Sequence, residues 1–256
     1  MNRRQVLNQS NAAVALAAPA AGATAAAAIP TPLPTKEALA MNSPHLYERP
    51  TRDNAVLLLV DHQVGLYTGV RDIETLELKH NVVGLAKAAL ALKVPVIVTT
   101  TTEKMWGPLI PELAEALPGV KRIERTTVNA WDERRVVDAV KATGRKKLIV
   151  TGISTDVCLA FPAISAIADG YNSYAVIDAS GGFTKTQVEM GVARMQQAGV
   201  IPVGYSNIAV EILADNAAPE ADAVYAALGM PFGGLVYGLK QYFSAAEPAS
   251  AAGGKG

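Results

Sequence analysis

The sequence predicts an α/β fold of three layers, in which helices cover both faces of a central, mostly parallel sheet of about six strands. Three observations support this Rossmann-like α/β/α arrangement. Several short runs of β-forming residues are apolar throughout, which is typical of strands buried on both faces. Segments with a helical pattern separate these runs, and glycines stand where the helices should end. Regular alternation of this kind favours parallel strands joined by crossover helices.

The first predicted strand is "AVLLLV" at 55–60, and it ends directly before Asp61. Four further apolar runs predict strands at 94–101, 146–153, 173–179 and 200–205, and "VKRIER" at 120–125 is the candidate for a short sixth strand. The segments between them predict helices at 75–92, 109–116, 132–142, 156–169 and 184–198. Gly144, Gly170 and Gly199 follow the last three helices and mark their ends.

The two ends of the chain differ in composition from the rest. Residues 1–28 carry Arg3 and Arg4, then an Ala-rich run, which together resemble a twin-arginine export signal with small residues for cleavage. We therefore expect a periplasmic or secreted protein, and a cytoplasmic one if this stretch is only a disordered leader. Residues 29–43 are predicted to be a Pro/Ala-rich linker, 44–243 the folded domain, and 244–256 a disordered tail.

Composition excludes several classes of function. Lys and Arg total 23, as do Asp and Glu, so the formal net charge is zero and a nucleic-acid partner is not expected. The one cysteine cannot form an internal disulfide or a thiolate zinc cage. The chain has three histidines and no HExxH, P-loop or GxGxxG motif, so we expect no metal and no cofactor. No stretch has the roughly 18 strongly apolar residues of a membrane span, so no membrane partner is expected.

Cys158 is the strongest candidate for chemistry. It follows a predicted strand and the turn "TGIST", in which Ser154 or Thr155 can cap the next helix. A thiol in the first turn of a helix lies near free backbone N–H groups and the positive end of the helix dipole, which favour a thiolate. The alternative is a small, buried structural cysteine.

A thiol nucleophile needs a base, and no histidine is well placed to be one. His62 follows Asp61, and successive strand residues point to opposite faces, so His62 should face away from a site that Asp61 faces. Asp61 itself stands at the C-terminal end of a buried strand, where α/β sheets form their sites. Arg125 ends the third strand and could stabilise a thiolate beside a carboxylate, with Lys121 and Arg122 as alternatives.

Several stretches together resemble the isochorismatase-like cysteine hydrolase superfamily, and within it the YcaC-like branch. The resemblance rests on these stretches, in order: "AVLLLVDHQVGL" (55–66), "VRDI" (70–73), "PVIVTTT" (95–101), "GPLIPEL" (107–113), the segment 129–171 and "VIDASGGF" (176–183). It covers about 55 to 213, and so nearly the whole predicted domain.

The resemblance implies a Cys–Asp–Arg triad, with Cys158 as nucleophile, Asp61 as base and Arg125 as the third member. It also implies a cis peptide at Ile153–Ser154, with the backbone N–H groups of Ser154 and Cys158 forming an oxyanion hole. No metal is implied, because the histidines of the nicotinamidase branch have no match here. The residues that could line the substrate pocket are Gln63, His62, Trp106, Asn129, Trp131 and Phe161.

We therefore expect a hydrolase that cleaves an amide-type C–N bond of a small molecule through a thioester, in a homo-oligomer such as a tetramer or octamer. The alternative is a non-catalytic or differently specific oligomeric binding protein on the same fold. Exposed apolar residues such as those of "MPFGGLVYG" (230–238) would be buried in either assembly.

Overall fold

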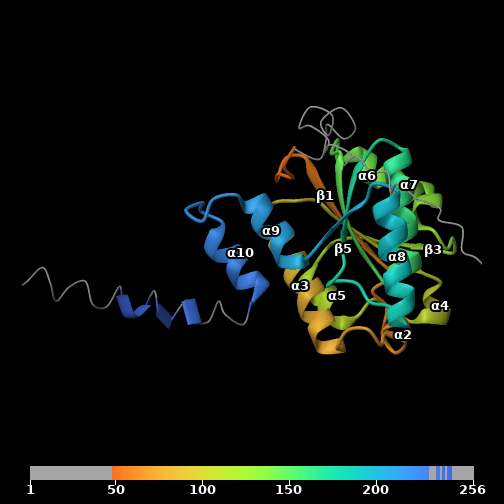
Figure 1. The fold of residues 1–256 in the computed structure, drawn as a ribbon, viewed down its shortest axis with the longest axis horizontal. Helices are drawn as coiled ribbons and strands as arrows, with labels where there is room; N and C mark the ends of the chain where they lie inside the picture. Colours follow the sequence, from red (N-terminus) through yellow and green to blue (C-terminus); the bar gives the residue numbers. More distant parts are fainter. Residues whose placement is uncertain (1–47, 231–234, 237, 240, 244–256) are drawn as a thin grey trace, which may run out of the picture.

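The computed structural model describes residues 48–230, 235–236, 238–239 and 241–243 (Figure 1). The predicted export signal, the linker and the tail lie outside these residues. In the described part, one parallel sheet of six strands has the order β3-β2-β1-β4-β5-β6. Its strands are β1 Ala55–Val60, β2 Val96–Thr101, β3 Arg122–Arg125, β4 Lys147–Gly152, β5 Asn172–Val176 and β6 Ile201–Val203.

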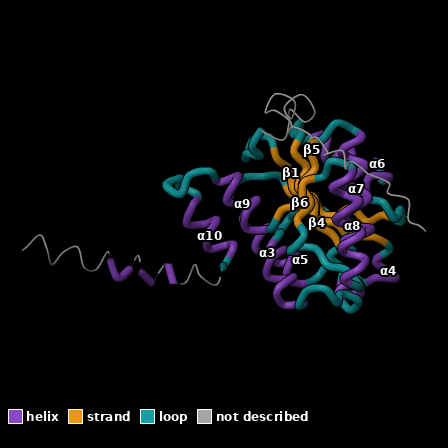
Figure 2. Tube along the Cα trace, viewed as in Figure 1, coloured by secondary structure: helices purple, strands orange, loops and turns teal. Residues whose placement is uncertain are grey.

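Helices cover both faces of the sheet, as Figures 1 and 2 show, so the predicted three-layer fold is confirmed. On one face, α3 (Thr75–Ala91), α5 (Pro111–Ala116), α9 (Tyr205–Leu213) and α10 (Ala221–Leu228) pack over Leu57 and Leu59 of β1. On the other, α6 (Arg134–Ala142), α7 (Ala160–Ala168) and α8 (Lys185–Gln197) pack over Val56 and Leu58. Alternate residues of β1 therefore enter two separate cores, which is why the strand is apolar throughout.

The short elements lie at the ends of strands. They are α2 (Val64–Tyr67), α4 (Glu103–Trp106), the 3₁₀ turn η2 (Ala130–Asp132) and the π-helical turn η3 (Thr155–Leu159). Helices α9 and α10 were not expected from the sequence, and the sixth strand ends two residues before the predicted end at 205. The strand ends at Val203 because Gly204 is the N-cap of α9 and Asp178 accepts a hydrogen bond from the Tyr205 N–H.

The strand order places a topological switch point between β1 and β4, because the chain runs outward from β1 to β3 and then returns to β4. Ligand sites of open parallel sheets form at the C-terminal ends of such strands. The residues just after β1 and β4 are therefore the ones to examine. No helix in the described part of the chain is both long and apolar enough to cross a bilayer.

Candidate active site

Asp61 follows β1 and is fixed by its backbone. Its N–H donates to Thr99 O at 2.9 Å, and its carbonyl oxygen accepts from the Gln63 N–H at 2.8 Å. Its φ is +58°, in the left-handed region that Asp tolerates better than most residues. This conformation turns the chain sharply at the strand end and leaves the Asp61 side chain fully buried.

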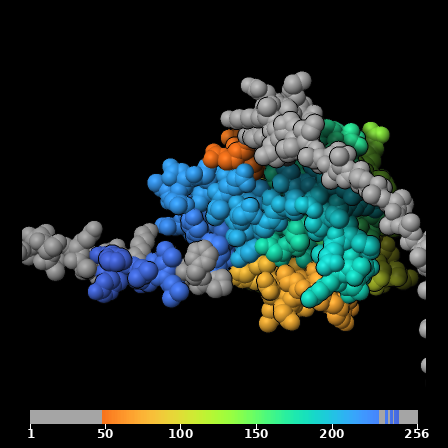
Figure 3. Space-filling model, viewed as in Figure 1, coloured from red at the N-terminus to blue at the C-terminus, as the bar shows by residue number. Residues whose placement is uncertain are grey.

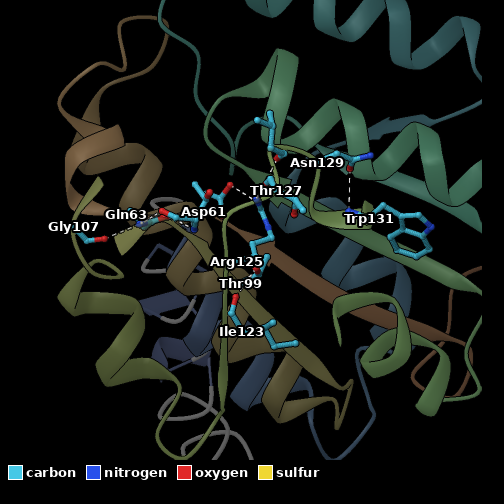
Figure 4. Close-up of polar contacts among 11 residues, drawn as sticks. Asp61, Gln63, Thr99, Gly107, Ile123, Arg125, Thr127, Asn129 and Trp131 are labelled. Atoms are coloured by element: carbon cyan, nitrogen blue, oxygen red, sulfur yellow. Dashed lines mark hydrogen bonds and ion pairs between the residues drawn. The ribbon is translucent and has the colours of Figure 1, made fainter. Parts of the chain in front are cut away.

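Arg125, the last residue of β3, reaches the Asp61 carboxylate. Its Nη2 donates to Asp61 Oδ2 at 2.6 Å, and both side chains have no exposed surface (Figure 4). Its Nη1 donates to the carbonyl oxygens of Thr127 and Val128. The alternatives at the strand's start, Lys121 and Arg122, are exposed. Arg125 is therefore the cation that the fold places against Asp61.

Cys158 lies in η3, the π-helical turn between β4 and α7, rather than in an ordinary first helical turn. Pro162 has no N–H for a hydrogen bond to the Cys158 carbonyl, and the backbone widens just before it. Gly152 lets this turn approach β4, because a Cβ at that position would lie 2.9 Å from the Cys158 carbonyl carbon. The expected cis peptide is present between Ile153 and Ser154.

The turn is held by contacts other than the predicted side-chain cap. Ser154 is the N-cap residue, yet its hydroxyl donates to Asp156 Oδ1 at 2.6 Å instead of capping the helix. The Ser154 carbonyl oxygen accepts from the Leu159 N–H at 3.1 Å. The backbone N–H of Ser154 faces the Cys158 thiol. These contacts give the nucleophile turn one defined shape.

The charges of the site are coupled. Burial raises the pKa of Asp61 to about 6, because desolvation outweighs the opposing effects of the Arg125 charge and the Cys158 thiol. Burial raises the pKa of Cys158 well above its usual range, and the Asp61 carboxylate raises it further by its charge and by accepting from the thiol. Arg125 and the Ser154 N–H lower it by less. The prediction that the Cys158 thiol ionises easily is therefore wrong for the resting site, where the raised pKa of Cys158 favours a neutral thiol beside the Asp61 carboxylate.

His62 faces away from this cluster, as predicted. Its ring contacts Thr151 Oγ1 at 2.7 Å through Nε2 and Tyr67 OH at 3.0 Å through Nδ1, and it has no exposed surface. Burial lowers the pKa of His62 to about 3, so the ring is neutral at ordinary pH. His62 therefore ties the end of β1 to β4 and α2.

The six residues expected around a pocket divide into three groups. Asn129 and Phe161 line an open hollow of about 540 Å³ beside the ion pair. The Gln63 amide donates to the carbonyl oxygens of Thr101 and Gly107 and accepts from the Thr101 N–H (Figure 4). Its polar atoms are therefore used to hold the backbone and not to bind a ligand.

The remaining three make packing contacts. Trp131 is buried edge-to-face against Tyr171 and donates to Asp169 at 2.9 Å. Trp106 packs against the core on the α3 side of the sheet, and His62 is enclosed. The expectation that these three residues line the pocket is therefore corrected. Their aromatic side chains pack inside the protein near the strand ends instead of facing a ligand.

Two features of the site were not expected from the sequence. Thr127 lines the hollow and also binds Arg125 through its carbonyl oxygen. Gly191 of α8 lies against the nucleophile turn, since a Cβ there would be 2.8 Å from Asp156 Cα. Neither residue stands in a distinctive motif, so only the folded arrangement reveals them. Among the described residues, no group of His, Cys, Asp or Glu side chains is arranged to hold a metal ion.

Comparison with known proteins agrees with this geometry. The model of the isochorismatase domain matches residues 55–205. The probable hydrolase YcaC of Escherichia coli strain K12 is 43% identical over 171 residues, which cover 66% of this chain and 82% of that protein.

Solved structures give the same result. YcaC of Pseudomonas aeruginosa, with hexane-2,5-diol and covalent acrylamide, is 40% identical, with a TM-score of 0.72 over 77% of this chain and 98% of that one. The octameric YcaC hydrolase of E. coli is 38% identical, with a TM-score of 0.73 and the same coverage. The buried carboxylate after β1 and the thiol after β4 thus lie in a chain whose sequence and fold are both similar to those of YcaC proteins. The chain belongs to the isochorismatase family, in its YcaC-like branch, and is a hydrolase.

Proposed function

We propose that the protein hydrolyses an amide-type C–N bond of a small molecule, with Cys158 as nucleophile, Asp61 as base and Arg125 as the stabilising cation. One observation carries the proposal. Asp61 Oδ2 is held by Arg125, while Oδ1 receives no hydrogen bond from a nitrogen or oxygen of the described residues and the carboxylate interacts with the Cys158 thiol. A carboxylate anchored on one side and unsatisfied on the other is suited to accept a proton.

The reaction begins from the neutral thiol. Asp61 takes the Cys158 proton as the sulfur attacks the carbonyl carbon, so a free thiolate is not needed beforehand. The carbonyl oxygen becomes an oxyanion, which the backbone N–H groups of Ser154 and Cys158 stabilise. The C–N bond then breaks, and the amine leaves with the proton that Asp61 held, which produces a thioester on Cys158.

Water completes the cycle. Asp61, again ionised, takes a proton from the water molecule that attacks the thioester carbonyl carbon. The C–S bond breaks, the carboxylic acid leaves, and the sulfur recovers its proton from Asp61. Arg125 remains charged throughout and stabilises the carboxylate whenever Asp61 is ionised.

The test is a panel of small primary and secondary amides incubated with purified protein, quenched in acid and examined by intact-protein mass spectrometry. The Pseudomonas YcaC structure contains covalent acrylamide, itself a small amide, which supports the choice of panel. We expect at least one amide to give a Cys158 adduct of acyl mass together with release of amine, and Cys158→Ala to give neither. Turnover by Cys158→Ala would contradict the role of Cys158 as nucleophile. No adduct and no release across the panel would favour the alternative of a non-catalytic binding protein.

We also propose that the protein works as a homo-oligomer, because its relative in E. coli is an octamer and an apolar surface is left uncovered here. The described large apolar side chains after α10 that are more than half exposed are Leu235, Val236, Leu239, Tyr242 and Phe243. Figure 3 shows this segment, in dark blue, at the edge of the molecule beyond α10. Light scattering should report an assembly for the full chain and a smaller species when the chain is ended at Gly229.

The N-terminal residues support a third proposal, export through the twin-arginine route. Fractionation of cells that express the full chain should find it outside the cytoplasm, and replacing Arg3 and Arg4 by Lys should retain it inside. Equal distribution of the two forms would contradict export.

A further inference from the structure

Two segments of the chain line the hollow beside the ion pair, and each is close in sequence to a residue of the proposed triad. Thr127, Val128 and Asn129, which follow β3, form one wall, and Phe161, Ile164 and Ser165 of α7 form the other. Phe161 is three residues after Cys158, so it lies within one turn of the nucleophile. Thr127 is two residues after Arg125 and binds its guanidinium through the backbone. A molecule in this hollow therefore lies against the two residues, Thr127 and Val128, whose carbonyl oxygens bind Arg125.

Thr127 Oγ1 and Thr155 Oγ1 are the two hydroxyl oxygens at the C-terminal end of the parallel strands that are buried without a partner among the described residues, and of the two residues only Thr127 lines the hollow. Burying a hydroxyl without a partner destabilises the folded state, so folding alone gives no reason to keep one here. An apolar side chain of similar shape, such as Val, would fill the same space without that cost.

Two atoms of the ion pair are in a similar state. Arg125 Nε is buried without a hydrogen-bond partner among the described residues, and Asp61 Oδ1 is buried without a hydrogen bond from any of their nitrogen or oxygen atoms. Together the three atoms supply an acceptor, a donor and a hydroxyl that does both. An amide group carries the matching donor and acceptor, so the set is complementary to a carboxamide.

We propose that Thr127 is a substrate-binding residue, whose hydroxyl binds the carboxamide of the incoming molecule in the hollow. This inference rests on the proposed function, because it assumes that Cys158 is the attacking group. It predicts a specific conflict between stability and function. Removing the hydroxyl should leave the free protein as stable as before, or more so, while weakening its reaction with molecules that carry an amide.

The experiment compares two alkylating probes on the full-length protein. Iodoacetamide carries a carboxamide and iodoethane does not, and both alkylate Cys158 with loss of iodide. The ratio of their rate constants cancels changes in thiol pKa, because both probes react with the same sulfur. The variants are Thr127→Val, Thr127→Ala and Thr127→Ser, and each is also measured for thermal unfolding.

Ser173 offers a matched control. Its hydroxyl is also buried without a partner among the described residues, but it lies near the start of β5, at the N-terminal end of the parallel strands, whereas the site lies at their C-terminal ends. Ser173→Ala should therefore keep the rate ratio of the wild type.

We expect Thr127→Val and Thr127→Ala to lower the ratio of the iodoacetamide to the iodoethane rate constant roughly threefold to tenfold, which is the effect of losing one hydrogen bond. Thr127→Ser should restore the wild-type ratio. We expect Thr127→Val to unfold at the same temperature as the wild type or higher. An unchanged ratio in both Thr127→Val and Thr127→Ala would overturn the assignment. If Asp61→Asn changes the labelling rate but the Thr127 variants keep the wild-type ratio, only this inference fails. If Asp61→Asn does not change the labelling rate, the proposed function fails as well.

Discussion

Arg125 Nη2 lies 2.6 Å from Asp61 Oδ2, and neither side chain has any exposed surface. A buried ion pair gains little net stability, because removing both charges from water costs several kcal/mol per ion. Here Arg125 Nε is also left without a partner among the described residues, and Asp61 Oδ1 receives no hydrogen bond from their nitrogen or oxygen atoms. The arrangement is therefore poor as a stabilising device and well suited to proton transfer.

Replacement of Arg125 by Gln should destabilise the fold in a pH-dependent way. Asp61 would then be a buried carboxylate without its cation, which costs about 3–5 kcal/mol at pH 8. The Asp61 pKa, already raised in the folded protein, would rise further, so protonation at lower pH should recover stability. Urea unfolding of Arg125→Gln and wild type at pH 5 and pH 8 measures this difference. Arg134→Gln, which removes an exposed pair with Asp138, is the control and should change little at either pH. A pH-independent loss in Arg125→Gln would contradict the prediction.

The rate of hydrolysis should rise with pH as Asp61 ionises. Asp61 must be a carboxylate to accept the thiol proton, and burial raises its pKa to about 6. For any amide that the panel identifies, kcat/KM should therefore increase through pH 6 and level off above it. A profile that is flat from pH 5 to 7, or that rises only above pH 8, would remove Asp61 from the role of base.

His62 should act by positioning Asp61 rather than by exchanging protons. His62→Leu leaves the hydroxyls of Thr151 and Tyr67 without a partner, which should cost about 1–3 kcal/mol in the free energy of unfolding. In a Thr151→Val, Tyr67→Phe background the same change should cost clearly less, because no buried hydroxyl is stranded.

The acid limb of stability gives a second readout for His62. Its folded pKa, about 3, lies below the ordinary value of 6.5, so the unfolded chain binds the proton more readily. This contribution to stability is present above pH 6.5 and is lost as pH falls. The difference in unfolding free energy between wild type and His62→Leu should therefore shrink from pH 7 to pH 5. A constant difference would mean that His62 is not held neutral.

Gly191→Ala should disturb the nucleophile turn from outside the site. The added Cβ would lie 2.8 Å from Asp156 Cα, and Asp156 accepts the Ser154 hydroxyl, so the turn that carries Cys158 must move. We expect a loss of about 1–3 kcal/mol in stability and slower iodoacetamide labelling of Cys158. Ala193→Gly, on an exposed position of the same helix, should cost about 1 kcal/mol through helix propensity but leave labelling unchanged. Equal labelling in wild type and Gly191→Ala would contradict a tight contact.

The sequence predicted the sheet and the polar residues at its strand ends because burial and alternation leave strong patterns. Asp61 and Cys158 each follow an apolar run, Arg125 ends a short and mostly charged strand, and parallel strands bring such ends together. The residues that line the pocket were harder to predict, because an aromatic or amide side chain gives the same sequence pattern whether it faces a ligand or packs inside the protein. Trp131 and Gln63 turned inward, while Thr127 carries no motif at all. The raised pKa of Cys158 also depends on burial and on the distance to Asp61, which spacing along the chain does not encode.

The most direct test of the account is the rate of iodoacetamide labelling of Cys158 from pH 5 to pH 10, in wild type and in Asp61→Asn. Burial and the Asp61 charge raise the thiol pKa, so the wild-type midpoint should lie above the ordinary thiol value of about 8.5. Removing that charge while keeping Arg125 should move the midpoint to lower pH, even though hydrolysis is lost with the base. Identical midpoints in the two proteins would show that the thiol and the carboxylate are not coupled, and would contradict the proposed mechanism.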